Sequence, residues 1–372
     1  MTNCITKEVL LSNIGIPSKK IGSWNIMITN LIEFDPTIFD YIVSPKPDFH
    51  VKKISNLEVK KTTFLDRLKK KYINSVYKRV NFWRVLREII VKQQRCQVHV
   101  IDDFSMVKAV HYFASREGLR NKLEILFYFH GFCFNYQNLI VNNIFSIDKL
   151  ILLTDSSYRK MLSISKELPF EIEILNNGVK SDIFFPVNEE RKKSLRKKLL
   201  LKPSSKYFLW VSQDRPKKGL KIILKAWTQL IKKNKEIYLI VIGTHHEIKG
   251  EKIIWFGRKS NRELNTFYQI SDYYLFTTLW QEGFGLSLVE ALKSGSKCIA
   301  SNIGPISEVL DDGNLGFLVD KPHVVKSWVD SITHVLNNNY NFNKKNIDLE
   351  KIYDFNTWVK KFRRISSISP LS

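Results

Sequence analysis

Short, strongly apolar runs separated by helical patterns recur along almost the whole chain, and this alternation limits its possible folds more than any other feature. The runs lack a strict alternation of apolar and polar residues, which favours strands buried on both faces of a parallel sheet. We assign predicted strands to 8–14, 39–44, 98–102, 124–129, 149–154 and 171–175, and then to 207–212, 237–243, 252–257, 273–278, 297–301 and 316–320.

The segments between the runs show helical periodicity. Between residues 219 and 233, apolar side chains recur every three or four positions and form one stripe. Repeated strand–helix units imply right-handed crossovers and doubly wound sheets. Because 372 residues exceed one ordinary domain, the sequence predicts an α/β chain with two Rossmann-like, doubly wound parallel-sheet domains.

The domain boundaries follow from the spacing of the predicted strands. We predict an N-terminal domain over 1–186, an interdomain linker over 187–205 and a C-terminal domain over 206–352. The linker assignment rests on a cluster of basic residues followed by a Pro-Ser-Ser breaker at 203–205. The remaining residues, 353–372, are predicted to form a helix that packs back on the N-terminal domain.

The chain is strongly basic, with 59 Lys and Arg against 36 Asp and Glu and a net charge of +23. Such a charge indicates an anionic partner, which nucleic acid, a membrane surface or a phosphorylated substrate can supply. Residues 60–95 are rich in Lys and Arg and also contain Phe64, Tyr72, Tyr77, Phe82 and Trp83. We predict that they bind an anionic membrane surface, and a core-packed helix with a solvated basic face explains them equally well.

The four cysteines stand apart, and no Cys-x-x-Cys pair is present. No apolar run approaches the roughly 20 residues that span a bilayer, and the short apolar patch near the N-terminus does not make a signal peptide. We therefore expect reduced thiols in a cytoplasmic protein that attaches peripherally to the inner face of a membrane.

Ligands of open α/β sheets bind beyond the carboxyl ends of the strands, and several polar or glycine-containing segments follow predicted strands here. Gly15 lies in a glycine-containing loop after the first strand, where an ordinary turn is equally plausible. His130 directly follows a predicted strand, where it either faces a ligand or serves as a structural histidine. Arg215 and Lys218 precede a helix, where they favour phosphate binding or form a solvated basic turn.

The segment LWQEGFGLSLVEALKSG, at 279–295, is the most informative. Glu282 and Glu290 stand eight positions apart, with glycines between them and a helix predicted from about Leu286. The backbone N–H groups of Gly283, Phe284 and Gly285 are available to a phosphate or a sugar hydroxyl, and Glu290 can accept two hydrogen bonds from a vicinal diol.

This segment resembles the Glu-x(7)-Glu motif of glycosyltransferase family 4, whose members are retaining enzymes with the GT-B fold. The resemblance extends over most of the C-terminal half and includes NNGVKSDIFFP at 176–186. It implies two domains that face each other across a cleft.

The resemblance also implies roles for single residues. Glu282 lies by the transferred sugar, with the amides of Phe284 and Gly285 near the sugar and phosphates. Glu290 holds the ribose, and Lys218 neutralises the diphosphate. In the other domain, His130 contacts the sugar and Gly15 leaves room beside the donor or acceptor.

Three departures from the family pattern affect the expected phosphate contacts. Ser212-Gln213 stands where the family usually has Gly-Arg, Thr277-Thr278 where Pro-Ser is common, and Gly295-Ser296-Lys297 where Gly-x-Pro is common. Arg215 stands two positions after Gln213, and the sequence leaves open whether it replaces the missing arginine.

No Asp-x-Asp triplet of the kind that holds a divalent metal is present, so we predict that cations and a helix N-terminus stabilise the leaving diphosphate instead. We therefore expect an enzyme with no metal or cofactor that transfers a sugar from a nucleotide-diphosphate sugar to a saccharide or lipid-linked acceptor in cell-surface polysaccharide biosynthesis.

Two alternatives compete with this interpretation. A nucleotide-sugar epimerase of similar two-domain shape also binds nucleotide sugars, and it is distinguished by whether release of nucleoside diphosphate requires an acceptor. A nucleic-acid-binding protein is suggested by the net charge of +23 alone, and no sequence signature of a nucleic-acid-binding fold supports it. We therefore expect no nucleic-acid partner.

Overall fold

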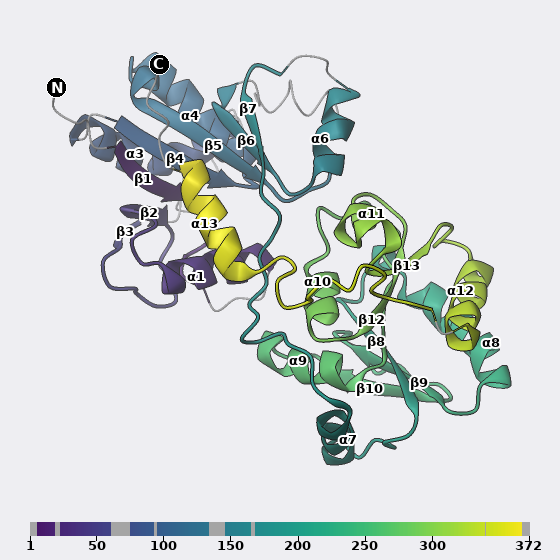
Figure 1. The fold of residues 1–372 in the computed structure, drawn as a ribbon. Helices are drawn as coiled ribbons and strands as arrows, with labels where there is room; N and C mark the ends of the chain where they lie inside the picture. The colour runs from purple at the N-terminus through teal and green to yellow at the C-terminus, as the bar shows by residue number, and fades with distance from the viewer. Residues whose placement is uncertain are drawn as a thin grey trace. The chain divides into compact units, whose positions relative to one another are not determined.

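The computed structural model describes residues 6–18, 23–60, 75–92, 95–133, 146–164, 168–338 and 340–366. The chain divides into two compact units (Figure 1). Unit 1 comprises Met1–Asn176 together with Val359–Ser372, and unit 2 comprises Asn177–Trp358. The chain therefore passes between the units twice, at residues 176 and 177 and again at 358 and 359.

Unit 1 is built on a parallel sheet whose seven described strands have the order β3-β2-β1-β4-β5-β6-β7. The order reverses its direction between β1 and β4, which is the topological switch point of a doubly wound sheet. The strands are β1 (Thr6–Leu11), β2 (Tyr41–Ser44), β3 (Ser55–Glu58), β4 (Arg95–Ile101), β5 (Leu123–Phe129), β6 (Lys149–Leu152) and β7 (Glu171–Ile174).

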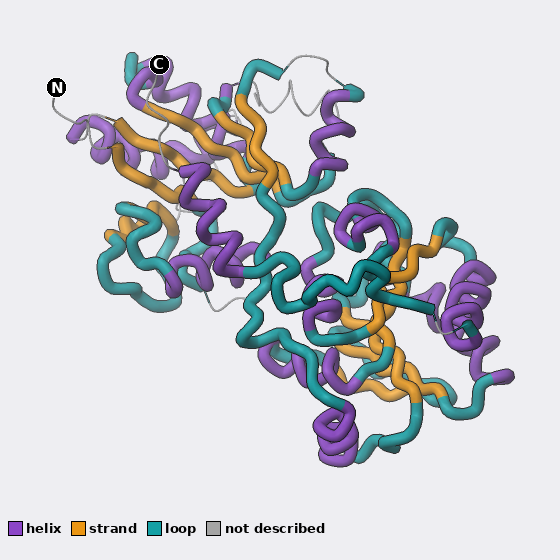
Figure 2. The backbone as a smooth tube through the Cα atoms, viewed as in Figure 1, coloured by secondary structure: helices purple, strands orange, loops and turns teal. Residues whose placement is uncertain are grey.

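The helices of unit 1 lie along the sheet, as Figure 2 shows. Two of them contribute Trp83 and Val110 to an apolar cluster that also contains Val9, Val98 and Ile125 from the central strands. Burial of these side chains on one face of the sheet is the main stabilising contribution. The helices are α1 (Ser23–Phe34), α3 (Val80–Lys92), α4 (Phe104–Arg116), α6 (Asp155–Leu162) and α13 (Phe355–Ser366), with the 3-10 turns η2 (Ser75–Arg79) and η3 (Arg120–Lys122).

Unit 2 is built on a second parallel sheet, whose six described strands have the order β10-β9-β8-β11-β12-β13. This order matches that of a dinucleotide-binding Rossmann domain, and its switch point lies between β8 and β11. The strands are β8 (Lys206–Val211), β9 (Ile237–Ile242), β10 (Ile253–Gly257), β11 (Tyr273–Phe276), β12 (Lys297–Ser301) and β13 (Gly316–Val319).

Helices cover both faces of the unit 2 sheet. Trp227 and Trp328 pack with Phe208 of the central strand on one face, and Tyr268 packs edge-on against Tyr274 of β11 on the other. The helices are α7 (Glu189–Lys198), α8 (Leu220–Lys233), α9 (Asn261–Ile270), α10 (Leu286–Lys293), α11 (Ile306–Val309) and α12 (Val325–Asn337), with η5 (Pro216–Lys218) and η6 (Asp311–Gly313).

The two parallel-sheet, Rossmann-like units confirm the predicted α/β fold, and a strand lies in each of the twelve predicted segments. Strand β3 (Ser55–Glu58) was not predicted, because Leu57 is its only apolar residue and all four residues are at least partly exposed. It is an edge strand that pairs with β2 alone among the described strands. An edge strand needs no continuous apolar run, and such a run was the signal used for the prediction.

The segment predicted to be an interdomain linker, 187–205, differs from expectation because it contains α7 and lies within unit 2. Arg196 of this helix is buried, donates to the carbonyl oxygens of Ile270 and Ser205, and lies 2.7 Å from a carboxylate oxygen of Asp272. These bonds anchor α7 beside the amino ends of β8 and β11. The division of the chain therefore falls at residue 176 rather than after 186.

The C-terminal helix α13 begins at Phe355, and its residues from Val359 onward belong to unit 1. The ring of Phe362 stacks on Tyr128 and on His99, with centroid distances of 5.3 and 5.8 Å. Arg363 forms an ion pair with Asp35. The predicted helix extended over 353–372, and residues 367–372 of it lie outside the described part of the chain.

The basic segment at 60–95 is described only in part, and residues 61–74, with Phe64 and Tyr72, lie outside the described ranges. Phe82 and Trp83 of α3 are buried in the core of unit 1, where Tyr77 also packs. These three aromatic residues are therefore not available to insert into a membrane. Membrane attachment stays a prediction that now rests on the basic residues and on 61–74. No helix within the described ranges combines the length and hydropathy needed to cross a bilayer.

The Arg196 contacts predict a large loss of stability when this side chain is truncated. Removing one partner of a buried, hydrogen-bonded ion pair costs about 3–5 kcal/mol. We expect Arg196→Ala to lower the melting temperature by about 10 °C in calorimetry. Lys197→Ala is the control, because Lys197 lies on the same helix but is exposed, and it should shift the transition by only about 1–2 °C. Equal shifts in the two variants would contradict the anchoring role of Arg196.

Candidate functional site

The predicted residues of unit 2 lie in the segments that follow β8 and β11, the strands on either side of the switch point. These strands pair in register, with Phe208 opposite Tyr273, so the segments that follow them leave the sheet side by side. We call residues 212–219 the β8 turn and residues 277–285 the β11 loop. The Leu279 N–H donates to the Lys217 carbonyl at 2.7 Å, and the Thr277 hydroxyl donates to the Lys218 carbonyl at 2.6 Å. The two segments therefore form one hydrogen-bonded structure.

Gly219 permits this close approach. It has a φ of 76°, and a Cβ atom at this position would lie 2.0 Å from the carbonyl oxygen of Thr277. A side chain here would combine a disfavoured left-handed backbone with a steric clash. The glycine that precedes α8 therefore fixes the β8 turn against the β11 loop.

Lys218 and Glu282 form the central contact of the site, with Nζ 2.6 Å from Oε1. Both side chains are largely buried, with exposed fractions of 23% and 19%. The hydroxyl of Thr278 donates to the same Glu282 oxygen at 2.9 Å. An ammonium group has three donors, so Lys218 keeps capacity for a phosphate oxygen, and Glu282 Oε2 has no partner among the described residues.

The β11 loop leads into the N-terminus of α10. None of the backbone N–H groups of residues 283–287 has an acceptor among the described residues. Free N–H groups and the helix dipole favour an anion at such an end. Gly285 starts the helix with a φ of 91°. The ring of Phe284 is buried edge-on against Tyr353, with a centroid distance of 5.0 Å, so this residue offers its amide rather than its side chain.

Glu290 lies one turn further along α10 and is partly buried. The hydroxyl of Tyr268 donates to its Oε2 at 3.1 Å, and the side chain of Asn261 also hydrogen-bonds to it. Burial raises the pKa of the Glu290 carboxyl to about 7, although both hydrogen bonds act in the opposite direction. At neutral pH this carboxyl is therefore poised between its neutral and charged forms.

The predicted phosphate ligand Arg215 lies at the start of η5, where its side chain is exposed. Its backbone carbonyl accepts from the Lys218 N–H at 2.8 Å. No ion pair holds its guanidinium among the described residues. The structure thus places Arg215 in the same turn as Lys218, and its role as a phosphate ligand stays a prediction.

In unit 1, Gly15 and His130 follow β1 and β5, the strands on either side of β4. A Cβ atom on Gly15 would lie 2.0 Å from the Lys46 carbonyl oxygen, so packing of the chain itself requires the glycine. The His130 ring nitrogen Nδ1 lies 3.2 Å from a carboxylate oxygen of Asp102. Residues 19–22 of the predicted glycine loop lie outside the described ranges. The roles of Gly15 and His130 toward a donor stay predictions.

Several residues that shape these sites were not predicted. Thr278 positions Glu282, Tyr268 holds Glu290, and Asp102 accepts from the backbone N–H of His130 and lies beside its ring. Two of them carried a signal, because Thr278 departs from the family pattern and Asp102 is the last residue of a predicted strand. Tyr268 lies inside an amphipathic helix, and nothing in the sequence alone distinguishes it from an ordinary core residue.

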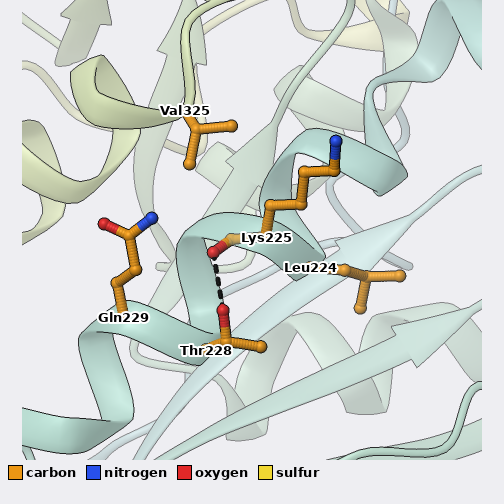
Figure 3. A pocket seen from close by; sticks show the side chains of 5 residues that line it. All are labelled: Leu224, Lys225, Thr228, Gln229 and Val325. Carbon is orange, nitrogen blue, oxygen red and sulfur yellow. Dashed lines mark hydrogen bonds between the residues drawn. The ribbon is translucent and has the colours of Figure 1, made fainter.

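A surface pocket of about 490 Å³ lies elsewhere on unit 2 (Figure 3). It is lined by Leu224, Lys225, Thr228 and Gln229 of α8 and by Val325 of α12. These side chains come from helices that cover one face of the sheet, rather than from the ends of strands. The pocket contains none of the predicted site residues, so it does not mark the candidate site.

A known protein family matches the part of the chain that holds the candidate site of unit 2. Residues 191–351 match the family model of glycosyl transferases group 1, and this range contains Lys218, Glu282 and Glu290. The C-terminal unit carries a glycosyl transferases group 1 domain.

Two curated relatives resemble about half of this chain. A lipopolysaccharide 1,2-N-acetylglucosaminetransferase of Salmonella typhimurium is 26% identical over 183 residues, which cover 44% of this chain and 47% of that protein. A D-inositol 3-phosphate glycosyltransferase of Mycobacterium bovis is 26% identical over 205 residues, 51% of this chain and 41% of that protein. The matched regions thus span less than half the length of these relatives.

Solved structures resemble the chain over almost its whole length. Sucrose-phosphate synthase from Thermosynechococcus elongatus superimposes with a TM-score of 0.74 at 15% identity, covering 97% of this chain and 98% of that one. The HepE protein of Anabaena, in complex with UDP and glucose, gives a TM-score of 0.71 at 14% identity, covering 98% and 100%. The likeness establishes the shared fold of both units.

The raised pKa of Glu290 predicts a specific pH dependence. The unfolded chain releases this proton near pH 4.5 and the folded protein near pH 7, so the folded state binds the proton more tightly. Stability is therefore lost as the pH rises between these values. We expect Glu290→Gln, which cannot ionise, to gain melting temperature relative to the wild type from about pH 5 to pH 8.

Glu263 provides a control of opposite sign. Hydrogen bonds from Ser260 lower the pKa of Glu263, so its ionisation stabilises the folded state. The melting temperature of Glu263→Gln should therefore fall relative to the wild type only as the pH rises toward about 4.5. Between pH 5 and pH 8 the difference between Glu263→Gln and the wild type should stay constant. A difference between Glu290→Gln and the wild type that does not change with pH would show that Glu290 is not desolvated.

Proposed function

We propose that this protein is a glycosyltransferase that moves a sugar from a nucleotide-diphosphate sugar to a hydroxyl group of a saccharide or lipid-linked acceptor. The Lys218–Glu282 contact carries the proposal, because it places a cation and a carboxylate 2.6 Å apart at the switch point of unit 2. The free N–H groups at the start of α10 lie in the same loop as Glu282. The glycosyl transferases group 1 domain supports the same activity.

Departure of the diphosphate is the step that this arrangement can assist. Breaking the bond between the sugar and the diphosphate leaves negative charge on the leaving oxygen. Lys218 can stay bonded to Glu282 and still donate to a phosphate oxygen, and the free amides of residues 283–287 offer further donors. Fixed donors aimed at a developing charge lower the barrier because they need little reorganisation. We propose that Lys218, Arg215 and α10 perform this role without a divalent metal.

The two glutamates have different proposed partners. The free Oε2 of Glu282 is available to a hydroxyl of the transferred sugar. Glu290 is proposed to bind the ribose diol, where its position beside Tyr268 orients the carboxyl. A diol that hydrogen-bonds to the charged form favours that form, so binding of the nucleotide should lower the pKa of Glu290.

The finer assignments rest on the sequence motif and on the names of relatives. The Glu-x(7)-Glu spacing supports family 4 and retention of the anomeric configuration. The lipopolysaccharide 1,2-N-acetylglucosaminetransferase supports a role in cell-surface polysaccharide biosynthesis. The net charge of +23 supports attachment to the inner face of a membrane. The complex of HepE with UDP and glucose makes UDP the first nucleotide to test.

The ribose assignment predicts that Glu290→Ala weakens nucleotide binding while the fold survives. Loss of charge-assisted hydrogen bonds should cost about 1.5–3 kcal/mol, a decrease in affinity of roughly 10- to 150-fold. Thermal shift with UDP, GDP and ADP identifies the nucleotide that the wild type binds, and calorimetry then compares the variant. Glu290→Gln is the matched control and should lose less, because it keeps hydrogen-bonding capacity. Unchanged affinity in Glu290→Ala would remove Glu290 from the site.

The leaving-group assignment predicts that Lys218→Ala lowers turnover about 100-fold or more. Lys221→Ala is the control, because Lys221 is an exposed lysine of α8 just beyond the β8 turn. EDTA should leave the wild-type rate unchanged, and inactivation by EDTA with recovery on adding Mn²⁺ would refute the metal-free mechanism. Nucleoside diphosphate should be released only when an acceptor is present, whereas an epimerase would not need one.

A further inference from the structure

Trp280 is unusual among the tryptophans of this protein. All eight lie in the described part of the chain, and Trp280 alone is exposed, at 62% of its surface. The other seven are buried or partly buried. A single exposed apolar residue needs no explanation in general, but Trp280 lies in the β11 loop, two positions before Glu282.

The loop holds the backbone of Trp280 in a defined position. The hydroxyl of Thr278 accepts from the Trp280 N–H at 3.3 Å and lies 3.1 Å from the Trp280 carbonyl oxygen. The same hydroxyl donates to Glu282. One side chain therefore contacts both the backbone of Trp280 and the carboxylate proposed to contact the transferred sugar.

A cation also lies beside the indole. Nζ of Lys217 is 5.9 Å from the centre of the Trp280 ring, a distance at which an ammonium group is attracted to the negative face of an aromatic ring. Lys217 itself is held by its carbonyl, which accepts from the Leu279 N–H at 2.7 Å. The ring is thus restrained on one side and open to solvent over most of its surface.

We propose that Trp280 is a binding platform for a sugar ring of the acceptor. This inference rests on the proposed glycosyltransferase function and specifies its acceptor side. A pyranose ring has a face of C–H groups whose weakly positive hydrogens fit the negative face of an indole, and contact removes apolar area of both from water. The acceptor class is therefore a saccharide with an unsubstituted C–H face next to the reacting hydroxyl.

The two side chains of this loop differ in exposure. Glu282 is only 19% exposed and forms the ion pair with Lys218, whereas Trp280 is 62% exposed. We therefore assign the acceptor to Trp280 and the donor sugar to Glu282.

The test uses the full-length protein and small glycosides as probes. Saturation-transfer NMR would measure contact with the methyl glycosides of glucose, galactose, mannose and N-acetylglucosamine. We expect transfer to the ring C–H protons of at least one glycoside in the wild type and a loss of about tenfold in Trp280→Ala. Trp280→Phe should restore most of the signal because it keeps an aromatic face. Leu200→Ala is the control, since Leu200 is 95% exposed and precedes the amino end of β8.

Two results would overturn the proposal. One is that no glycoside receives saturation in the wild type, or that Trp280→Ala receives as much as the wild type. The other is that Trp280→Ala weakens binding of UDP-glucose but not of UDP, because Trp280 would then contact the donor sugar. Nucleotide binding is measured separately by thermal shift. If the wild type binds no nucleotide, the proposed function is contradicted. If the wild type binds a nucleotide but no glycoside, only the role of Trp280 is contradicted.

Discussion

The pairing of β8 with β11 is the constraint on which the candidate site depends. Parallel strands that are neighbours in space but distant in sequence deliver their following segments to the same edge of the sheet. Here that edge receives Lys218 from one strand and Glu282 from the other, 64 positions apart in the chain. Two hydrogen bonds, from Thr277 and Leu279, lock the segments together. The ion pair is therefore a consequence of sheet topology and not of local sequence.

Helix α10 carries two ionisable side chains whose burial disfavours their charged forms. It carries Glu290, whose pKa is raised by burial, and three positions later Lys293, whose pKa burial lowers. The ammonium group of Lys293 donates to the carbonyls of Glu350 and Ile352 at 2.5 and 2.8 Å. Buried ionisable groups are tolerated when backbone oxygens or hydroxyls replace the lost water. This helix is thereby fastened to the segment that precedes α13.

The sequence predicted most of the fold because its strands are buried on both faces and read as continuous apolar runs. It failed for β3, where Leu57 is the only apolar residue, and for α7, because its charged residues resemble a linker and nothing in the sequence shows that Arg196 is buried. The motif placed Glu282 and Glu290 on one segment. Their partners Thr278 and Tyr268 could not be predicted, because each becomes a partner only through geometry.

The contact between Gly219 and the carbonyl oxygen of Thr277 has a consequence for how this site can evolve. A methyl group cannot be inserted there, because its carbon would lie 2.0 Å from that oxygen. A mutant library that randomises the β8 turn should therefore keep glycine at 219 whatever substrate is selected for. Arg215 and Lys217 in the same turn are exposed, and substitutions there change the charge that the turn presents without this steric clash.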